Sequence, residues 1–153
     1  QLKKWLKIDY SDVWGEFHYS FIKRKVFAEE YIGKNLNNFK FMCYHGIPRF
    51  IYLSVKENGK KYRTFFDINW NRLDFYCAGP PHPTDLYPKP KTFDLMKKIV
   101  RKLAKPLKFV RVDLYEYKDE VRLGELTFIP FNSLLSCKNP KNNIEISKYF
   151  KLF

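Results

Sequence analysis

The sequence predicts a single α+β domain, built mainly from an antiparallel sheet with flanking helices. Two groups of strand-like segments, each folded back by a tight turn, predict antiparallel strands, and one amphipathic stretch between them predicts a covering helix. The chain has 153 residues, of which 45% are hydrophobic and 19% aromatic. This is enough for one packed core and argues against disorder. We therefore expect one domain over residues 1–153.

The first part of the chain is expected to contain a helix end and a strand. Leu2, Trp5 and Leu6 recur at helical spacing, which indicates the last turns of a helix. The segment KVFAEEYI, residues 25–32, carries several β-branched and aromatic residues and precedes a turn that starts at Gly33. We predict a strand there.

The middle of the chain has the pattern of a three-stranded meander. Strands are predicted over residues 39–44, 49–56 and 61–67. Residues 45–48 join the first two strands in a hairpin-type connection. The second and third flank Asn58-Gly59, a pair typical of a two-residue hairpin turn.

The last part is expected to contain a loop, a helix and a second hairpin. Residues 77–91 are rich in proline, which removes hydrogen-bond donors and predicts a loop. Thr92 is a candidate helix N-cap, and the helix should end at Pro106. An apolar stripe lies between them: Phe93, Met96, Val100 and Leu103. Two further strands, residues 109–117 and 120–128, then flank Lys118-Asp119.

The net charge of the chain limits the kinds of binding partner that the sequence predicts. The formal net charge is +13 and the pI is about 9.6, but the basic clusters are short and lack a zinc-finger, RNP or helix-turn-helix pattern. We therefore expect no dedicated nucleic-acid partner, only a general attraction to polyanionic substrates or to anionic lipid near a membrane. No apolar run approaches the ~20 residues of a membrane-spanning helix, and residues 1–7 lack the apolar core of a signal peptide.

The cysteines predict no metal site. Cys43, Cys77 and Cys137 are far apart in the sequence and have no ligand-like spacing to each other or to histidine. We interpret them as reduced, mostly buried thiols, as in a cytoplasmic protein.

The last hairpin concentrates the polar chemistry. With a one-residue bulge in its connection, Asp113 faces Glu125 and Arg111 faces Thr127, all on one face, because alternate side chains of a strand share a face. Two facing carboxylates repel each other unless a cation lies between them. Mg²⁺ takes carboxylate and phosphate oxygens together, and a nearby arginine suits phosphate. An exposed sheet face with alternating charges gives the same pattern, so spacing alone leaves both interpretations open.

The hairpin text FVRVDLY…GELTFIP resembles the closing motif of ATP-grasp ligases, an Arg-x-Asp strand followed by a hairpin and a Glu-x-Asn strand that ends near proline. The segments KVFAEEYI, NNFKFMCYHGIPRFI and FFDINWNRLDF precede it in the order of the TupA-like branch, which is associated with cell-surface polysaccharide synthesis. The resemblance spans nearly the whole chain. It implies the antiparallel sheet of the C-terminal part of an ATP-grasp domain, with ATP and Mg²⁺ as cofactors.

The resemblance also assigns roles to individual residues. Asp113 and Glu125 match the magnesium ligands, and Thr127 stands where most ATP-grasp enzymes have asparagine and the TupA-like branch also has threonine. Arg111 matches the catalytic arginine that faces the phosphates. The remaining matches are nucleotide contacts, at the adenine hinge, the ribose and the phosphates: Glu29, Glu30, Tyr31, Ile32, Asn35 and Lys40.

One departure from the family affects the expected activity. The family places a lysine, a Gly-rich loop and a substrate-side domain upstream, and none of them is found in this sequence. We therefore expect the C-terminal part of a cytoplasmic, ATP- and Mg²⁺-dependent carboxylate–amine ligase that acts on a polysaccharide or amino-acid precursor. This chain alone should be inactive. Two alternatives remain: a non-catalytic or glycosyltransferase-associated module of a polysaccharide cluster, and a basic module that binds polyanions or nucleic acid.

Overall fold

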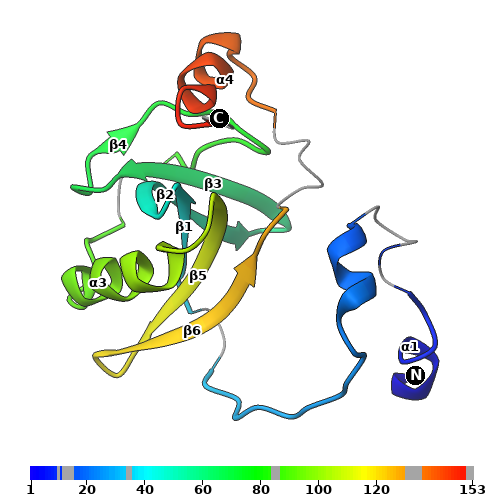
Figure 1. Cartoon of the computed structure of the whole chain (residues 1–153). Coiled ribbons are helices and arrows are strands. Elements are labelled where there is room, and N and C mark those ends of the chain that lie inside the picture. The colour runs from blue at the N-terminus through cyan, green and yellow to red at the C-terminus, as the bar shows by residue number, and fades with distance from the viewer. Residues whose placement is uncertain (10, 12–15, 34–35, 84–86, 130–135, 151–153) are drawn as a thin grey trace.

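A computed structural model of the chain describes residues 1–9, 11, 16–33, 36–83, 87–129 and 136–150. Within this part, six strands form one antiparallel sheet in the order β4-β3-β2-β1-β5-β6 (Figure 1). This confirms the predicted class, an α+β fold with an antiparallel sheet and flanking helices. The strands are β1 (Asn38–Tyr44), β2 (Ile47–Glu57), β3 (Lys60–Asp67), β4 (Arg72–Leu73), β5 (Phe109–Tyr117) and β6 (Glu120–Thr127).

The meander β1–β2–β3 forms through two tight turns, as predicted. His45 and Gly46 connect β1 to β2, and Asn58 and Gly59 connect β2 to β3. All four residues have positive φ, between 48° and 76°, a conformation that suits the right-handed twist of the strands they join. Strand β1 also pairs with β5 along its whole length. It therefore links the meander to the second hairpin in one sheet.

Helix α3 (Phe93–Ala104) covers one face of the sheet (Figure 1). It begins after Thr92, as predicted, although the Thr92 hydroxyl donates to the Glu116 carboxylate at 2.8 Å and does not cap the helix. Its buried stripe packs against the apolar side chains of the sheet and forms the main core. The buried residues of the helix are Phe93, Met96, Val100 and Ala104.

The opposite face of the sheet carries a second core and a group of polar side chains. Helix α4 (Pro140–Ser147) lies over this face, and Ile146 packs there with Met42, Tyr44 and Phe50 in a second core. Polar side chains occupy the same face farther along β1 and β5. This polar part of the face carries the candidate site.

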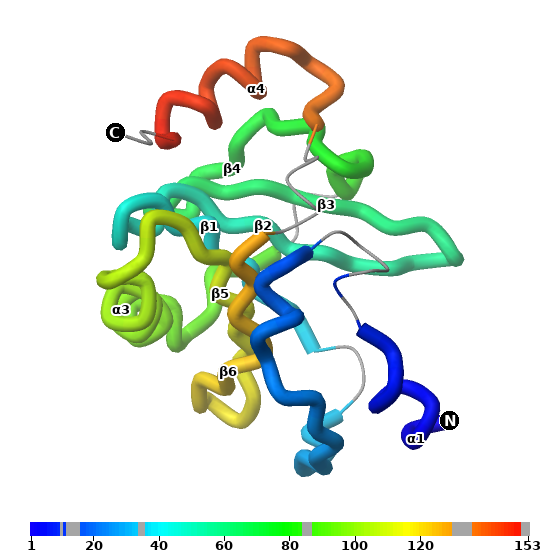
Figure 2. Tube along the Cα trace, turned by 45° about the vertical axis from the view of Figure 1, so that its right-hand side comes forward, coloured from blue at the N-terminus to red at the C-terminus, as the bar shows by residue number. Residues whose placement is uncertain are grey.

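The predicted strand over residues 25–32 is wrong. The segment is extended with exposed side chains, but it makes no strand ladder with any described residue. A strand needs a partner for its backbone groups, which its own sequence pattern cannot supply. Helix α1 (Leu2–Trp5), at the predicted helical spacing, and the 3-10 helix η1 (Phe17–Phe21) lie with this segment along the β6 side of the molecule (Figure 2).

The expectation of three reduced cysteines is also wrong. Cys77 and Cys137 face each other in an isolated antiparallel bridge and form a disulfide. They are 60 residues apart in sequence, and only the second core brings them together. Cys43 is free and fully buried on β1.

None of the helices among the described residues has the length and apolar character needed to cross a bilayer.

Cys43 is expected to resist thiol reagents in the native protein. Burial raises the pKa of its thiol from 9.0 to about 12, so the reactive thiolate is about a thousandfold rarer at pH 8. Ellman's reagent should label no thiol in the native protein, one after unfolding in urea, and three after unfolding and reduction. Three labelled thiols in the unfolded, unreduced protein would contradict the Cys77–Cys137 bond.

Candidate functional site

A row of paired residues crosses the face of the sheet opposite α3. Asp113 on β5 pairs with Glu125 on β6 and with Lys40 on β1. Lys40 pairs in turn with Tyr52 on β2, and Tyr52 with Phe65 on β3. Directly opposed residues of antiparallel strands share a face. The row therefore places two acids, a lysine and a tyrosine side by side on the face opposite α3.

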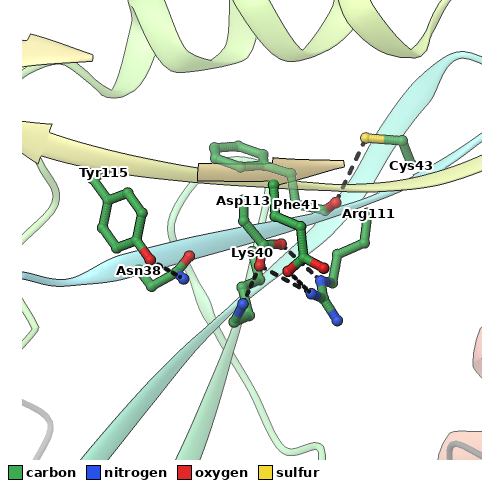
Figure 3. Close-up of polar contacts among 8 residues, drawn as sticks. Asn38, Lys40, Phe41, Cys43, Arg111, Asp113 and Tyr115 are labelled. Carbon is green, nitrogen blue, oxygen red and sulfur yellow. Dashed lines mark hydrogen bonds and ion pairs between the residues drawn. The ribbon is translucent and has the colours of Figure 1, made fainter. Parts of the chain in front are cut away.

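The acids of this row are held by two cations. Arg111 donates from Nε to Asp113 Oδ1 at 2.7 Å and from Nη2 to Asp113 Oδ2 at 3.0 Å. It also donates from Nη2 to Glu125 Oε2 at 2.8 Å. Lys40 Nζ forms an ion pair with Asp113 Oδ2, so Arg111 and Lys40 converge on the same carboxylate (Figure 3). The cations that hold the facing acids together in this structure are thus side chains of the protein.

Burial and the neighbouring carboxylates shift the pKa values of Arg111 and Lys40 in opposite directions. Burial disfavours the charged form of Arg111, but the hydrogen bonds and charges of Asp113 and Glu125 outweigh it and raise the pKa of Arg111. For Lys40, burial has the larger effect and lowers the pKa despite the Asp113 carboxylate. Asp113 itself is only 1% exposed. The Arg111–Asp113 pair is therefore a fixed, buried unit of the site.

The residue pairing predicted for the hairpin is present, but the bulge lies elsewhere. Arg111 pairs with Thr127 and Asp113 with Glu125, whereas Leu114 pairs with Leu123. Gly124 is therefore the extra residue, and the predicted bulge in the connection is wrong. A Cβ atom at Gly124 would lie 2.5 Å from Cε2 of Tyr115, so the bulge needs a residue without a side chain.

The residues present fit a magnesium ion that is shared with phosphate. Thr127 Oγ1 is buried and has no hydrogen-bond partner among the described residues. Glu125 keeps half of its side chain exposed. Asp113 Oδ1 accepts one hydrogen bond, from Arg111 Nε, and keeps a lone pair, whereas Asp113 Oδ2 is shared by Arg111 and Lys40. No group of three or more His, Cys, Asp or Glu residues in the described ranges is placed to hold a metal. The donor set is thus two carboxylates and a hydroxyl, which suits Mg²⁺ that takes its other ligands from phosphates and water.

The predicted hinge residues line a cavity beside the acids. The cavity has a volume of about 600 Å³ and lies between the segment before β1 and the β5–β6 hairpin. Tyr115, two residues after Asp113 and on the same face, forms one wall, and Asn38 donates to its hydroxyl at 2.9 Å (Figure 3). Asn35 lies outside the described residues. The lining includes Glu29, Glu30, Tyr31, Ile32, Arg122 and Gly124.

The structure adds three residues to those predicted from the sequence. Tyr52 lies next to Lys40 in the row and is only 2% exposed. Burial raises the pKa of its hydroxyl, and the charges of Arg111 and Arg63 act against this shift. Lys61 and Arg63 lie on β3, on the same face as Phe65, because they are four and two positions away from it. Alternation within β3 indicates that Lys61 and Arg63 share a face. The pairing of β3 with β2, and of β2 with β1, is what places Lys61 and Arg63 on the same face as the acids.

Comparison with known proteins identifies the family of the chain. The family model for TupA-like ATP-grasp proteins matches residues 1–151, essentially the whole chain. Neither the curated proteins nor the solved structures contain a significant match to the chain. ATP-grasp proteins in general use ATP and Mg²⁺, and the acid row, its arginine and the neighbouring cavity fit such ligands. The chain belongs to the TupA-like ATP-grasp family.

Proposed function

We propose that this chain forms the C-terminal, nucleotide-binding part of an ATP- and Mg²⁺-dependent carboxylate–amine ligase of cell-surface polysaccharide synthesis. The observation that carries the proposal is the convergence of Lys40, Arg111, Asp113 and Glu125 on one sheet face, beside a cavity of about 600 Å³. In such a reaction the substrate carboxylate attacks the γ-phosphorus of ATP and releases ADP. An amine then attacks the acyl phosphate and releases phosphate, which leaves an amide.

Each residue has a role that follows from its position. Asp113, Glu125 and Thr127 would hold Mg²⁺, which supplies positive charge to the phosphates when it is bound. Arg111 is fixed by Asp113 and neutralises negative charge that develops on the transferred phosphoryl group. Lys40 approaches the phosphates from β1. The exposed segment 29–32 and the Tyr115 wall would enclose the adenine, and Asn35, which lies outside the described residues, would contact the ribose.

We expect this chain to bind Mg²⁺-ATP weakly and not to hydrolyse it. The upstream lysine and Gly-rich loop that the resemblance implies are not among these 153 residues, and each charge-assisted contact with phosphate is worth about 1.5–3 kcal/mol. Losing two or three of them lowers the affinity on the order of 10³-fold or more. Titration calorimetry on the wild type, with Glu125→Gln and Glu120→Gln, tests this. Both glutamates lie on β6 with more than half of their side chains exposed, but only Glu125 belongs to the site.

The two variants distinguish the possible outcomes. Glu125→Gln should weaken Mg²⁺-ATP binding about tenfold, and Glu120→Gln should leave it unchanged. Micromolar binding by the wild type would contradict the expected weakness. Equal effects of both variants, or binding that ignores Mg²⁺ and falls steeply with salt, would replace this proposal by a general polyanion-binding module.

A further inference from the structure

The solvent-facing side of helix α3 carries a stripe of cations. Residues 89–108, which include the helix, contain one acid and more than half of the net charge of +13. Four of the cations recur at steps of three and four residues, so they lie on one face of the helix, opposite the apolar stripe that packs on the sheet. All four are exposed. We call them the α3 stripe: Lys98, Arg101, Lys102 and Lys105.

The α3 stripe has no acid beside it to balance its charge. Asp94 is the one acid of the helix, and it pairs at 2.8 Å with Lys97, a lysine outside the stripe. Lys91, which precedes the helix, pairs with Asp119. None of the four stripe cations forms an ion pair with another residue of the described ranges. The stripe therefore places four positive charges along about 10 Å of helix.

The fold fixes the stripe and turns it outward. The buried side of α3 belongs to the main core. The end of the helix is also tied to the turn between β1 and β2, because the N–H groups of His45 and Gly46 donate to the carbonyls of Lys108 and Leu107 at 2.7 and 3.1 Å. In both views no described element lies beyond α3 (Figure 1 and Figure 2). The stripe is thus a rigid, convex ridge on the outside of the molecule.

The side chains of the outer face indicate what this ridge can bind. Apart from the buried Phe93, the helix has no aromatic ring on which a base could stack, and it has no amide or hydroxyl side chain to read a base edge. It adds one apolar group, Leu95, which is 48% exposed and lies on the same side as Lys98 and Lys102. Charge and a single apolar side chain are what the surface of an anionic bilayer attracts.

We propose that the α3 stripe docks this protein on the anionic surface of a membrane, with α3 lying flat against the phospholipid headgroups. The candidate site lies on the other face of the sheet, so it stays turned toward solvent in the docked protein. The inference is independent of the ligase function, because it uses only the charges on α3. It also assigns to particular residues the attraction to anionic lipid that the net charge predicts.

Vesicle sedimentation with two matched double variants tests the proposal. The full chain is sedimented with vesicles of phosphatidylcholine, and with vesicles of phosphatidylcholine and phosphatidylglycerol in equal amounts, at constant ionic strength. The wild type should bind only the anionic vesicles. Lys98→Gln combined with Lys102→Gln should weaken this binding about thirtyfold, because each cation near an anionic surface contributes about fivefold. Lys141→Gln combined with Lys148→Gln removes the same charge from the two ends of α4, on the other side of the sheet, and should change binding less than about twofold.

A fluorescent label on α3 locates the contact. Cys43 is buried and Cys77 is bonded to Cys137, so Leu95→Cys supplies the one accessible thiol. An environment-sensitive dye attached there should brighten and shift to the blue when anionic vesicles are added. The same dye on Ile144→Cys, at a position of α4 that is 62% exposed, should not respond. Vesicle binding without a change at position 95 would place the contact on another surface and overturn the proposal.

Other results would also overturn it. Equal losses in the two double variants would mean that only the net charge matters, and equal binding of both kinds of vesicle would exclude a role for lipid charge. Tighter binding to a DNA duplex than to anionic vesicles, lost with Lys98→Gln and Lys102→Gln, would make α3 a nucleic-acid-binding surface. Arg101 and Lys102 lie in the last turn of the helix, where cations also stabilise the helix dipole. A loss of stability in urea with unchanged vesicle binding would therefore assign the stripe to the helix alone.

Discussion

Asp113→Asn is expected to destabilise the protein by about 3–5 kcal/mol. Asp113 is 1% exposed and receives Arg111 in two hydrogen bonds and Lys40 in an ion pair. The substitution keeps the size of the side chain but leaves two partly buried cations without their main counter-charge, which is the costly way to break a buried ion pair. Urea denaturation followed by tryptophan fluorescence measures the loss. A change below 1 kcal/mol would mean that water already screens this cluster.

Two further variants show whether the loss arises from the cluster. Glu125→Gln removes a carboxylate from a side chain that is 51% exposed, and should cost about 1 kcal/mol or less. Asp113→Asn combined with Lys40→Met should be less destabilised than the sum of the two single variants, because the second change removes an unpaired cation. Additive losses would show that Lys40 and Asp113 do not interact energetically.

Phe93→Ala should cost about 3–5 kcal/mol, the range for large-to-small substitutions of buried aromatic residues. Phe93 is 1% exposed at the start of α3. Its ring lies 6.1 Å from that of Phe41, in a stacked arrangement, and 5.0 Å from that of Trp70, edge to face. The substitution leaves a cavity between the helix and the sheet. Differential scanning calorimetry gives the effect as a fall in Tm.

Leu95→Ala on the same helix is the matched control. Leu95 is 48% exposed, so its truncation should cost less than 1 kcal/mol. Similar losses for both variants would indicate that α3 does not dock on the sheet through the Phe93 face. The pair therefore tests the packing of the fold independently of nucleotide binding.

The sequence predicts those parts of the structure that depend on neighbouring residues. The Asp113–Glu125 pairing follows from strand alternation and one bulge, and α3 follows from its apolar stripe. The bulge lies at Gly124, beside the Tyr115 ring, and no local sequence pattern reveals this position. The segment 25–32 has strand-like composition but no strand partner among the described residues. Whether a partner exists is a property of the rest of the fold.

The parts of the candidate site that the sequence misses come from distant strands. Lys40 meets Asp113 across 73 residues, and the family resemblance, not spacing, indicates its role. Tyr52 and Arg63 join the site only through the register of β1, β2 and β3. The same reasoning explains the disulfide, because Cys77 and Cys137 are brought together by tertiary packing. Long-range pairing is the information that a single sequence lacks.

The central position of β1 has a consequence for the order in which the molecule folds. The meander β1–β2–β3 and the hairpin β5–β6 each join strands that are neighbours in sequence, and both can form early. The seam between β1 and β5 must close a loop from Tyr44 to Phe109, at an entropic cost of about 4 kcal/mol. Lys40 meets Asp113 on this seam. If the meander and the hairpin have each formed but β1 has not yet paired with β5, the strands are present and the candidate site is not. In that state Lys40 and Asp113 are exposed and unpaired, and they pair only when the sheet is complete.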